Sequence, residues 1–185
     1  MKQFLLIFII IFFSQTSFGQ ENGLLVDQRD GEEYKTVKIG TQVWMAENLN
    51  YDAGSGCSCY EENNRNCDQY GRLYDCETAK KVCPDGWHLP SKSEFETLLD
   101  NVGDDKKQRY LALKKDGTSG FSALFAGYRN LDNKFMSIGS YGYFWSSSQP
   151  LGDYAWYLKL YKGYKEALMD TSIKTFGRSV RCIQD

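Results

Sequence analysis

The chain has 185 residues, of which 42% are hydrophobic and 25% charged, and its formal net charge at pH 7 is -2. Its 22 lysines and arginines are scattered, so the charge gives no reason to expect nucleic acid or an anionic membrane surface as a partner. The length suffices for one domain with its own hydrophobic core.

The first 19 residues are typical of a signal peptide. Lys2 precedes an unbroken apolar run over residues 4–13, and the small residues Ser17 and Gly19 provide a cleavage site. The run is shorter than the roughly 20 residues of a spanning helix, so we expect no integral membrane segment after cleavage near Gly19. No cysteine follows directly, which argues against a lipid anchor. We expect the mature chain to be secreted, periplasmic or at the cell surface.

Residues 20–32 are polar and lack periodicity, which indicates a short leader before a domain over residues 33–185. A β-hairpin is predicted next, because apolar residues alternate with polar ones on both sides of a Gly40-Thr41 turn. Residues 52–69 are polar and hold three cysteines, so we expect a loop whose rigidity comes from local disulfides.

Two helix starts follow. Asp75 can cap a brief helix that ends before Pro84, and Ser91 with Glu94 forms a capping box. The apolar face of the second helix consists of Phe95, Leu98, Leu99 and Val102. A further short helix is predicted over residues 108–114.

From Gly120 onward the pattern predicts strands and turns. The expected strands cover residues 121–129, 134–138, 141–147, 154–161, 164–169 and 178–183. Within residues 154–161, leucines alternate with Tyr157, Lys159 and Tyr161, so one side of that strand is apolar and the other presents tyrosines.

Six cysteines lie after the expected cleavage site: Cys57, Cys59, Cys67, Cys76, Cys83 and Cys182. An even number in an exported protein indicates disulfides, and six cysteines allow 15 pairings. Zinc binding is poorly supported, because there is no CxxC pair and only one histidine. We expect no metal and no cofactor.

Six ordered blocks over residues 31–185 resemble the Fibrobacter succinogenes major paralogous domain, FISUMP. They are YKTVKIGTQVWMAENLNY, CYEENNRNC, YGRLYDCETAKKVCPDGWHLPSKSEFETLL, GFSALFAGYRN, GSYGYFWSSS and SVRCIQD. GWHLPSKSEFETLL is also similar to a block of formylglycine-generating enzymes. The resemblance implies an α+β, C-type-lectin-like fold, with two helices packed on a mixed, mostly antiparallel sheet, long loops and bracing disulfides.

The resemblance also implies two cysteine pairs, Cys59 with Cys67 and Cys83 with Cys182. Cys57 and Cys76 depart from the family pattern, and we expect these remaining two to pair with each other. Formylglycine-generating chemistry uses a close cysteine pair near the C-terminus, where this chain has only Cys182, so that activity is not expected.

Other catalytic patterns are also missing. The single histidine, His88, stands at a helix entry, where a structural role is expected. The EPN, QPD and WND motifs of calcium-dependent lectins are absent, and no acid pair can be named for glycoside hydrolysis.

The 13 tyrosines and 4 tryptophans are more informative, because aromatic rings suit sugar stacking, protein interfaces and core packing alike. By fold analogy, the candidate binding residues are Arg129, Asn130, Asp132, Asn133, Tyr141, Tyr143, Asp153 and Tyr154. The hypothesis is a non-enzymatic recognition module for a protein or glycan. The alternatives are a carbohydrate- or sulfatase-related processing enzyme and a structural component of the cell envelope.

Overall fold

The computed structural model describes residues 22–185, and the expected signal peptide lies outside them. In chain order the elements are β1 (Asn22–Val26), β2 (Glu33–Ile39), β3 (Gln42–Met45), β4 (Cys57–Ser58), a 3₁₀ helix η1 (Tyr60–Glu62), α1 (Asn64–Tyr70), β5 (Leu73–Tyr74), α2 (Cys76–Ala79), β6 (Trp87–His88), α3 (Lys92–Val102), α4 (Lys106–Leu113), β7 (Tyr128–Arg129), β8 (Phe135–Met136), β9 (Tyr141–Trp145), β10 (Tyr154–Tyr161), β11 (Glu166–Ile173) and β12 (Ile183–Gln184). No helix among them is long and apolar enough to cross a membrane.

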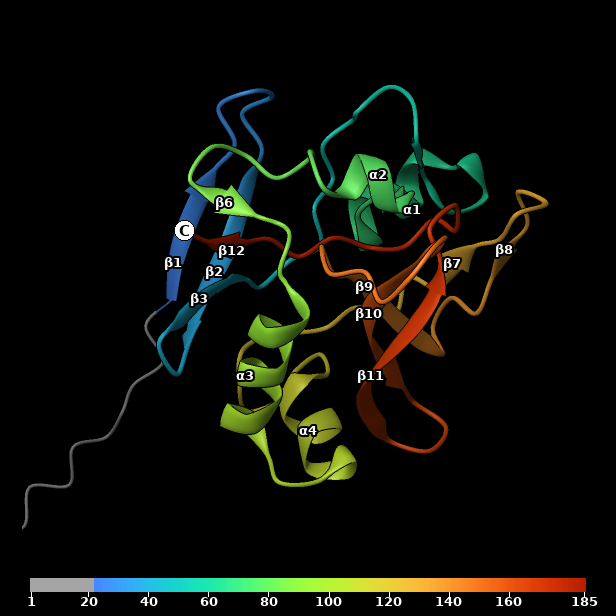
Figure 1. Cartoon of the computed structure of the whole chain (residues 1–185). Coiled ribbons are helices and arrows are strands. Elements are labelled where there is room, and N and C mark those ends of the chain that lie inside the picture. The colour runs from blue at the N-terminus through green and yellow to red at the C-terminus, as the bar shows by residue number, and fades with distance from the viewer. Residues whose placement is uncertain (1–21) are drawn as a thin grey trace, which may run out of the picture.

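Two antiparallel sheets organise the molecule (Figure 1). The larger has the strand order β1-β2-β3-β12-β6, and the smaller has the order β11-β10-β9. Two further pairs, β4 with β5 and β7 with β8, are short. The mixed α/β class and the antiparallel pairing agree with expectation, but the main strands divide between two sheets instead of forming one.

One core joins both sheets to helices α3 and α4. Side chains from the two sheets and the two helices meet there, and its members include Val37, Trp44, Phe95, Leu98, Leu113, Phe144 and Leu158. The predicted capping box at the start of α3 is confirmed, since Ser91 and Glu94 exchange side-chain to backbone hydrogen bonds. A local signal therefore sets the start of the helix whose apolar face fills this core.

A second core lies on the other faces of the two sheets. It contains Leu25, Tyr34, Met45, Leu49, Tyr74, Val82, Trp145, Tyr157 and Cys182. The Cys83–Cys182 disulfide ties the segment before β6 to the segment before β12, across 99 residues of sequence. The Cys59–Cys67 disulfide joins η1 to α1. Both pairs that the family resemblance implied are present.

The third expected disulfide is wrong, because Cys57 and Cys76 are both free. The β4–β5 register sets Cys57 opposite Tyr74, whereas Cys76 lies beyond the end of β5 and is the first residue of α2. The Cys76 amide donates a hydrogen bond to the Lys174 carbonyl. Cys76 is fully buried, and burial raises the pKa of its thiol to about 11.

Three segments differ from the sequence-based expectation. The expected leader contains β1, which pairs along its whole length with β2. The expected disulfide loop contains α1, which Asn63 caps by accepting a hydrogen bond from the amide of Arg65. Residues 121–127 form no regular strand and make a single β-bridge at Ala123. A buried side chain, and not a neighbouring strand, holds the start of this segment.

A buried arginine holds that irregular segment. The guanidinium of Arg181 donates to the carbonyl oxygens of Phe121 and Ser122, to that of Met45, and to the side-chain oxygen of Asn48. Arg181 is fully buried, so these oxygens take the place of water around its charge. One side chain thus connects the last segment of the chain, the first hairpin and residues 121–122.

Candidate functional site

Strand β10 gives the three-stranded sheet two different faces. Leu158 and Leu160 point into the core with α3 and α4, whereas Tyr157, Lys159 and Tyr161 alternate with them and lie on the opposite face. The register extends that opposite face over Tyr141, Tyr143 and Trp145 of β9 and over Glu166, Leu168 and Asp170 of β11. Sheet alternation alone therefore gathers aromatic and charged side chains on one surface.

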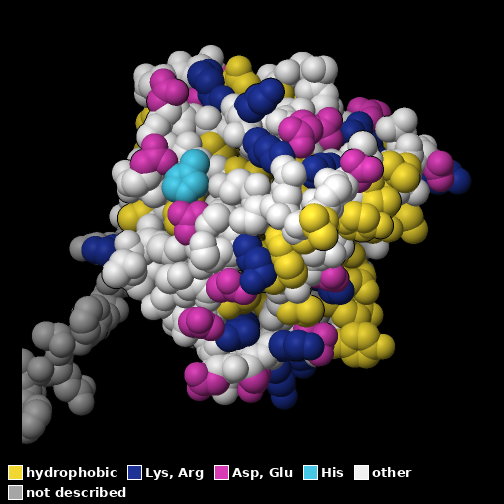
Figure 2. All heavy atoms as spheres, in the orientation of Figure 1, with side chains coloured by type: hydrophobic (Ala, Val, Ile, Leu, Met, Phe, Trp, Pro, Cys, Tyr) yellow, Lys and Arg dark blue, Asp and Glu magenta, His cyan; other side chains and the backbone are white. Residues whose placement is uncertain are grey.

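The aromatic part of this surface is the tyrosine face, which consists of Tyr128, Tyr141, Tyr143, Tyr157, Tyr161 and Tyr164. Its base, formed by Tyr143 and Tyr157, is buried, while Tyr164 is 75% exposed at the β10–β11 turn. Figure 2 shows hydrophobic side chains gathered along the side of the molecule where β8 and β11 lie in Figure 1.

Three rings of the tyrosine face form a parallel stack. The ring centroids of Tyr143 and Tyr141 are 5.3 Å apart with an interplanar angle of 2°, and those of Tyr141 and Tyr161 are 4.2 Å apart at 3°. Tyr164 meets Tyr161 edge to face at 4.9 Å. A Cβ atom at Gly163 would lie 2.5 Å from the Tyr161 hydroxyl, so a larger residue there would displace the Tyr161 ring. The stack runs from the buried base to the surface.

A buried cation lies beneath the stack. The guanidinium carbon of Arg178 lies 3.8 Å from the ring centroid of Tyr157 and 4.5 Å from that of Tyr143. Its Nε and Nη1 atoms are buried and have no hydrogen-bond partner. Burial lowers the pKa of Arg178. The ring faces therefore supply much of the electrostatic stabilisation of this charge.

An ion pair lies on the same face, beside the rings. Lys159 Nζ lies 3.3 Å from Asp170 Oδ2, which also accepts a hydrogen bond from the Tyr157 hydroxyl at 3.1 Å. Burial alone would raise the pKa of Asp170, but hydrogen bonds from the Thr171 amide, Lys159 and Tyr157 outweigh it and lower the pKa. Asp170 is thus a stable anion with several partners.

The structure places four predicted site residues in the β7–β8 hairpin beside the tyrosine face: Arg129, Asn130, Asp132 and Asn133. Asn130 Oδ1 accepts hydrogen bonds from the amides of Asp132 and Lys134, and Asn133 has a φ of 57°. These residues shape the turn. The contact from this hairpin to the stack comes instead from Tyr128, whose ring meets Tyr143 edge to face at 5.4 Å.

The other predicted residues divide between the two ends of β10. Tyr141 and Tyr143 belong to the stack, near the end of β10 at Tyr161. Asp153 and Tyr154 lie at the start of β10, where the Asp153 carbonyl accepts a hydrogen bond from the Lys174 amide. The eight candidate residues that the sequence suggested therefore do not form one site.

Sequence reasoning left Tyr161, Tyr164, Phe176 and Arg178 outside the candidate set. The alternation in residues 154–161 and the following turn were available signals for Tyr161, because an antiparallel neighbour sets it opposite Tyr141. No local pattern identifies Arg178, since its aromatic neighbours come from β7, β9, β10 and residue 176.

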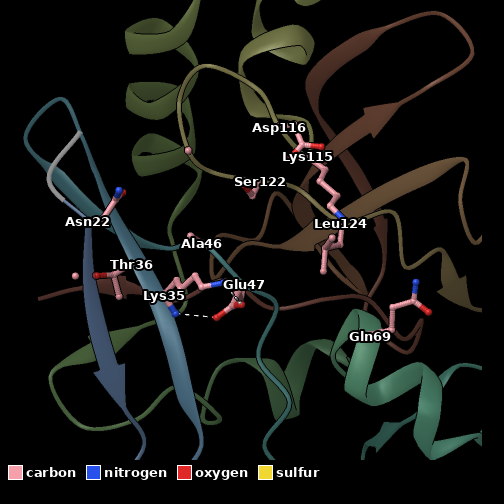
Figure 3. Close-up of a pocket in the computed structure, with 12 residues that line it drawn as sticks. Asn22, Lys35, Thr36, Ala46, Glu47, Gln69, Lys115, Asp116, Ser122 and Leu124 are labelled. Atoms are coloured by element: carbon pink, nitrogen blue, oxygen red, sulfur yellow. Dashed lines mark hydrogen bonds and ion pairs between the residues drawn. The ribbon is translucent and has the colours of Figure 1, made fainter. Parts of the chain in front are cut away.

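A polar hollow of about 570 Å³ lies elsewhere, between the first hairpin and residues 115–124 (Figure 3). Lys35, Glu47, Gln69, Lys115 and Asp116 contribute to its lining, and Lys35 Nζ lies 3.7 Å from Glu47 Oε1. Its lining contains no aromatic ring. A second hollow of about 640 Å³ lies beside α2.

His88 connects Glu94, near the start of α3, with Asp185. Its Nε2 lies 2.9 Å from Glu94 Oε1 and its Nδ1 lies 2.6 Å from Asp185 Oδ1. Burial lowers the pKa of His88, but its hydrogen bonds to the carboxylates of Asp185 and Glu94 outweigh this effect and raise the pKa overall. Within residues 22–185, no three His, Cys, Asp or Glu side chains are placed to hold a metal ion.

Fold and surface together define a disulfide-braced α+β domain with an aromatic face on its smaller sheet. Residues 37–184 match the model of the Fibrobacter succinogenes major domain family. The chain therefore belongs to this family. The searches of curated proteins and of solved structures each found no match.

Proposed function

We propose that this protein is an exported, non-enzymatic recognition module that binds a polypeptide on its tyrosine face. The observation that carries the proposal is the parallel stack of Tyr143, Tyr141 and Tyr161, which reaches the surface beside an exposed Tyr164. Tyrosine is enriched at protein interfaces, because it buries much apolar area and ends in a hydroxyl group. A C-type-lectin-like architecture, in which loops surround such a surface, is part of the proposal.

The stack favours a polypeptide over a glycan. Sugars bind aromatic side chains by lying flat against a free ring face. The ring of Tyr141 contacts the rings of Tyr143 and Tyr161. Gly163 lies against the phenol end of Tyr161. The half-buried ring of Tyr141 therefore has two parallel ring neighbours, unlike an isolated exposed ring on which a sugar can stack. Ring edges and hydroxyl groups, together with Lys159 and Asp170, suit the mixed apolar and polar surface of a peptide.

The enzymatic alternative has no specific observation in its favour. A general acid of a glycoside hydrolase needs a carboxyl group with a raised pKa. Among the described residues, the carboxyl groups with a shifted pKa are all shifted downward: Asp27, Asp52, Glu77, Glu94 and Asp170. These side chains serve as acceptors for donors that are already in place.

The test exposes the exported protein in parallel to a phage-displayed peptide library and to a glycan array. We expect selected peptides whose affinity falls by about tenfold or more in Tyr161→Ser, because central aromatic contacts dominate interface energies. Tyr154→Ser is the matched control, since Tyr154 is 48% exposed at the other end of the same strand and its loss should leave binding unchanged.

Two outcomes contradict the proposal. Peptide binding that Tyr161→Ser and Tyr141→Ser leave unchanged would separate recognition from the tyrosine face. Glycan binding that these variants abolish, with no peptide selected, would replace the polypeptide by a sugar. Thermal unfolding of each variant confirms that a lost affinity does not reflect a lost fold.

A further inference from the structure

Strand β1 forms the end of the five-stranded sheet, and no backbone group within residues 22–185 pairs with its outer edge, where the Val26 carbonyl accepts a hydrogen bond from the exposed Gln28 side chain at 3.4 Å. Lys35 of β2 directs both backbone groups toward β3, because its carbonyl accepts from Ala46 and its amide donates to Glu47. Its β1 partner, Leu24, therefore does not share in the β1–β2 hydrogen bonds. Antiparallel alternation then directs the N–H and C=O of Asn22, Leu24 and Val26 outward.

The surface along this edge is apolar and uncharged. The five residues of β1 are Asn, Gly, Leu, Leu and Val, and their pairing with β2 runs without a bulge. Leu24 is 59% exposed and Val26 is 40% exposed. Lysine, proline and bulges are the usual features that prevent pairing at an edge strand, and β1 has none of them.

Both end strands of the smaller sheet are protected by comparison. The outer edge of β9 already has backbone partners, because the Trp145 amide donates to the Ser179 carbonyl and the Tyr143 carbonyl accepts from the Ser179 amide. The outward amide of Thr171 in β11 donates to Asp170 Oδ1 at 2.8 Å, and Ala167 of the same strand is fully buried. At the other end of the large sheet, β6 is only two residues long. Among the described strands that end a main sheet, β1 alone combines length with an unprotected edge.

We propose that β1 pairs antiparallel with β1 of a second copy of this chain, about a two-fold axis at Leu24. A row of outward N–H and C=O groups is complementary only to another extended backbone. In this pairing Leu24 lies opposite its own copy and Asn22 lies opposite Val26. Three outward residues in each copy provide about six inter-strand hydrogen bonds.

The composition of β1 suits self-association. A two-fold axis at Leu24 sets that residue beside its own copy, so a charge at this position would repel itself. The uncharged β1 avoids that cost, and the exposed side chains of Leu24 and Val26 lie on one face of the strand, where the second copy covers them. The paired segment is only five residues long in each copy, so we expect a reversible dimer. It is independent of the tyrosine face.

The experiment is sedimentation velocity on the exported protein from about 10 µM to about 1 mM, a range suited to weak interfaces. We expect a concentration-dependent shift from monomer to dimer. Leu24→Pro removes an outward donor that the β1–β2 ladder does not use, and Leu24→Lys sets two charges together at the axis; both should remain monomeric. Leu131→Lys is the control, since Leu131 is 57% exposed in the β7–β8 hairpin and should leave the dimer intact.

Hydrogen exchange at the Leu24 amide supplies the second measurement. Protection that increases with protein concentration supports pairing between copies. Protection that is independent of concentration would show that another segment of the same chain covers the edge, which overturns the proposal. A monomer at every concentration, or a dimer that both Leu24 variants retain, also overturns it. If Leu24→Pro fails to fold by circular dichroism, Leu24→Lys decides the result.

Discussion

The Cys83–Cys182 disulfide should contribute more stability than the Cys59–Cys67 disulfide. The first encloses 99 residues of sequence and the second encloses 8. In the chain-entropy model, these closures are worth about 4.7 and about 2.5 kcal/mol at 25 °C. Cys59, Cys67 and Cys182 are buried and Cys83 is partly buried, so loss of packing is no greater in the Cys83–Cys182 pair than in the other. The expected difference between the double alanine variants is therefore about 2 kcal/mol.

Urea unfolding at equilibrium, followed by circular dichroism, measures both losses. Replacing both cysteines of a pair avoids free thiols that would form new bonds. The m-value must be compared as well, because an opened loop expands the unfolded chain and changes the surface exposed on unfolding. Equal losses of unfolding free energy in the two variants would refute the entropic reasoning.

Two buried arginines and one histidine give further predictions. Arg181→Met should lower the free energy of unfolding by about 3 to 5 kcal/mol in urea titrations, because several buried oxygens lose their donor. Arg178→Met should cost clearly less, since two of its nitrogens already lack partners; a cost equal to that of Arg181→Met would contradict this account. The folded-state pKa of His88 lies above 6.5, so its contribution is complete below pH 6.5 and disappears as pH rises through the raised value. Unfolding of His88→Gln should therefore differ from the wild type more at about pH 5.5 than at about pH 9, and a constant difference would argue against the Glu94 and Asp185 contacts.

Elements with a local signal were predictable from the sequence. The capping box at Ser91 and the spacing of Phe95 and Leu98 are contained within α3, so eleven residues were enough to identify it. Strand β1 has no such signal, because its order comes from pairing with β2 and its apolar residues do not alternate with polar ones. Helix α1 was missed for a related reason: its side chains are polar, and Cys67 supplies its only buried contact.

The tyrosine face was only partly predictable, since it depends on neighbours across strands. Tyr141 and Tyr143 were candidates by composition, whereas their contact with Tyr161 depends on the β9–β10 register. Asp153 and Tyr154 are close to this group in sequence but lie at the opposite end of β10. The third cysteine pair failed on the same kind of detail, because Cys57 lies in β4 and Cys76 starts α2, and no local pattern shows how these two elements place the thiols.

The division of the smaller sheet into two faces also affects how this domain can change over time. Positions that contribute to the fold, such as Leu158 and Leu160, alternate along β10 with positions that contribute to the surface. A substitution at Tyr164 or Leu168 alters the side of the sheet that faces away from α3 and α4 and leaves the helical side untouched. Sequences with this fold can therefore change that surface while they keep a common core.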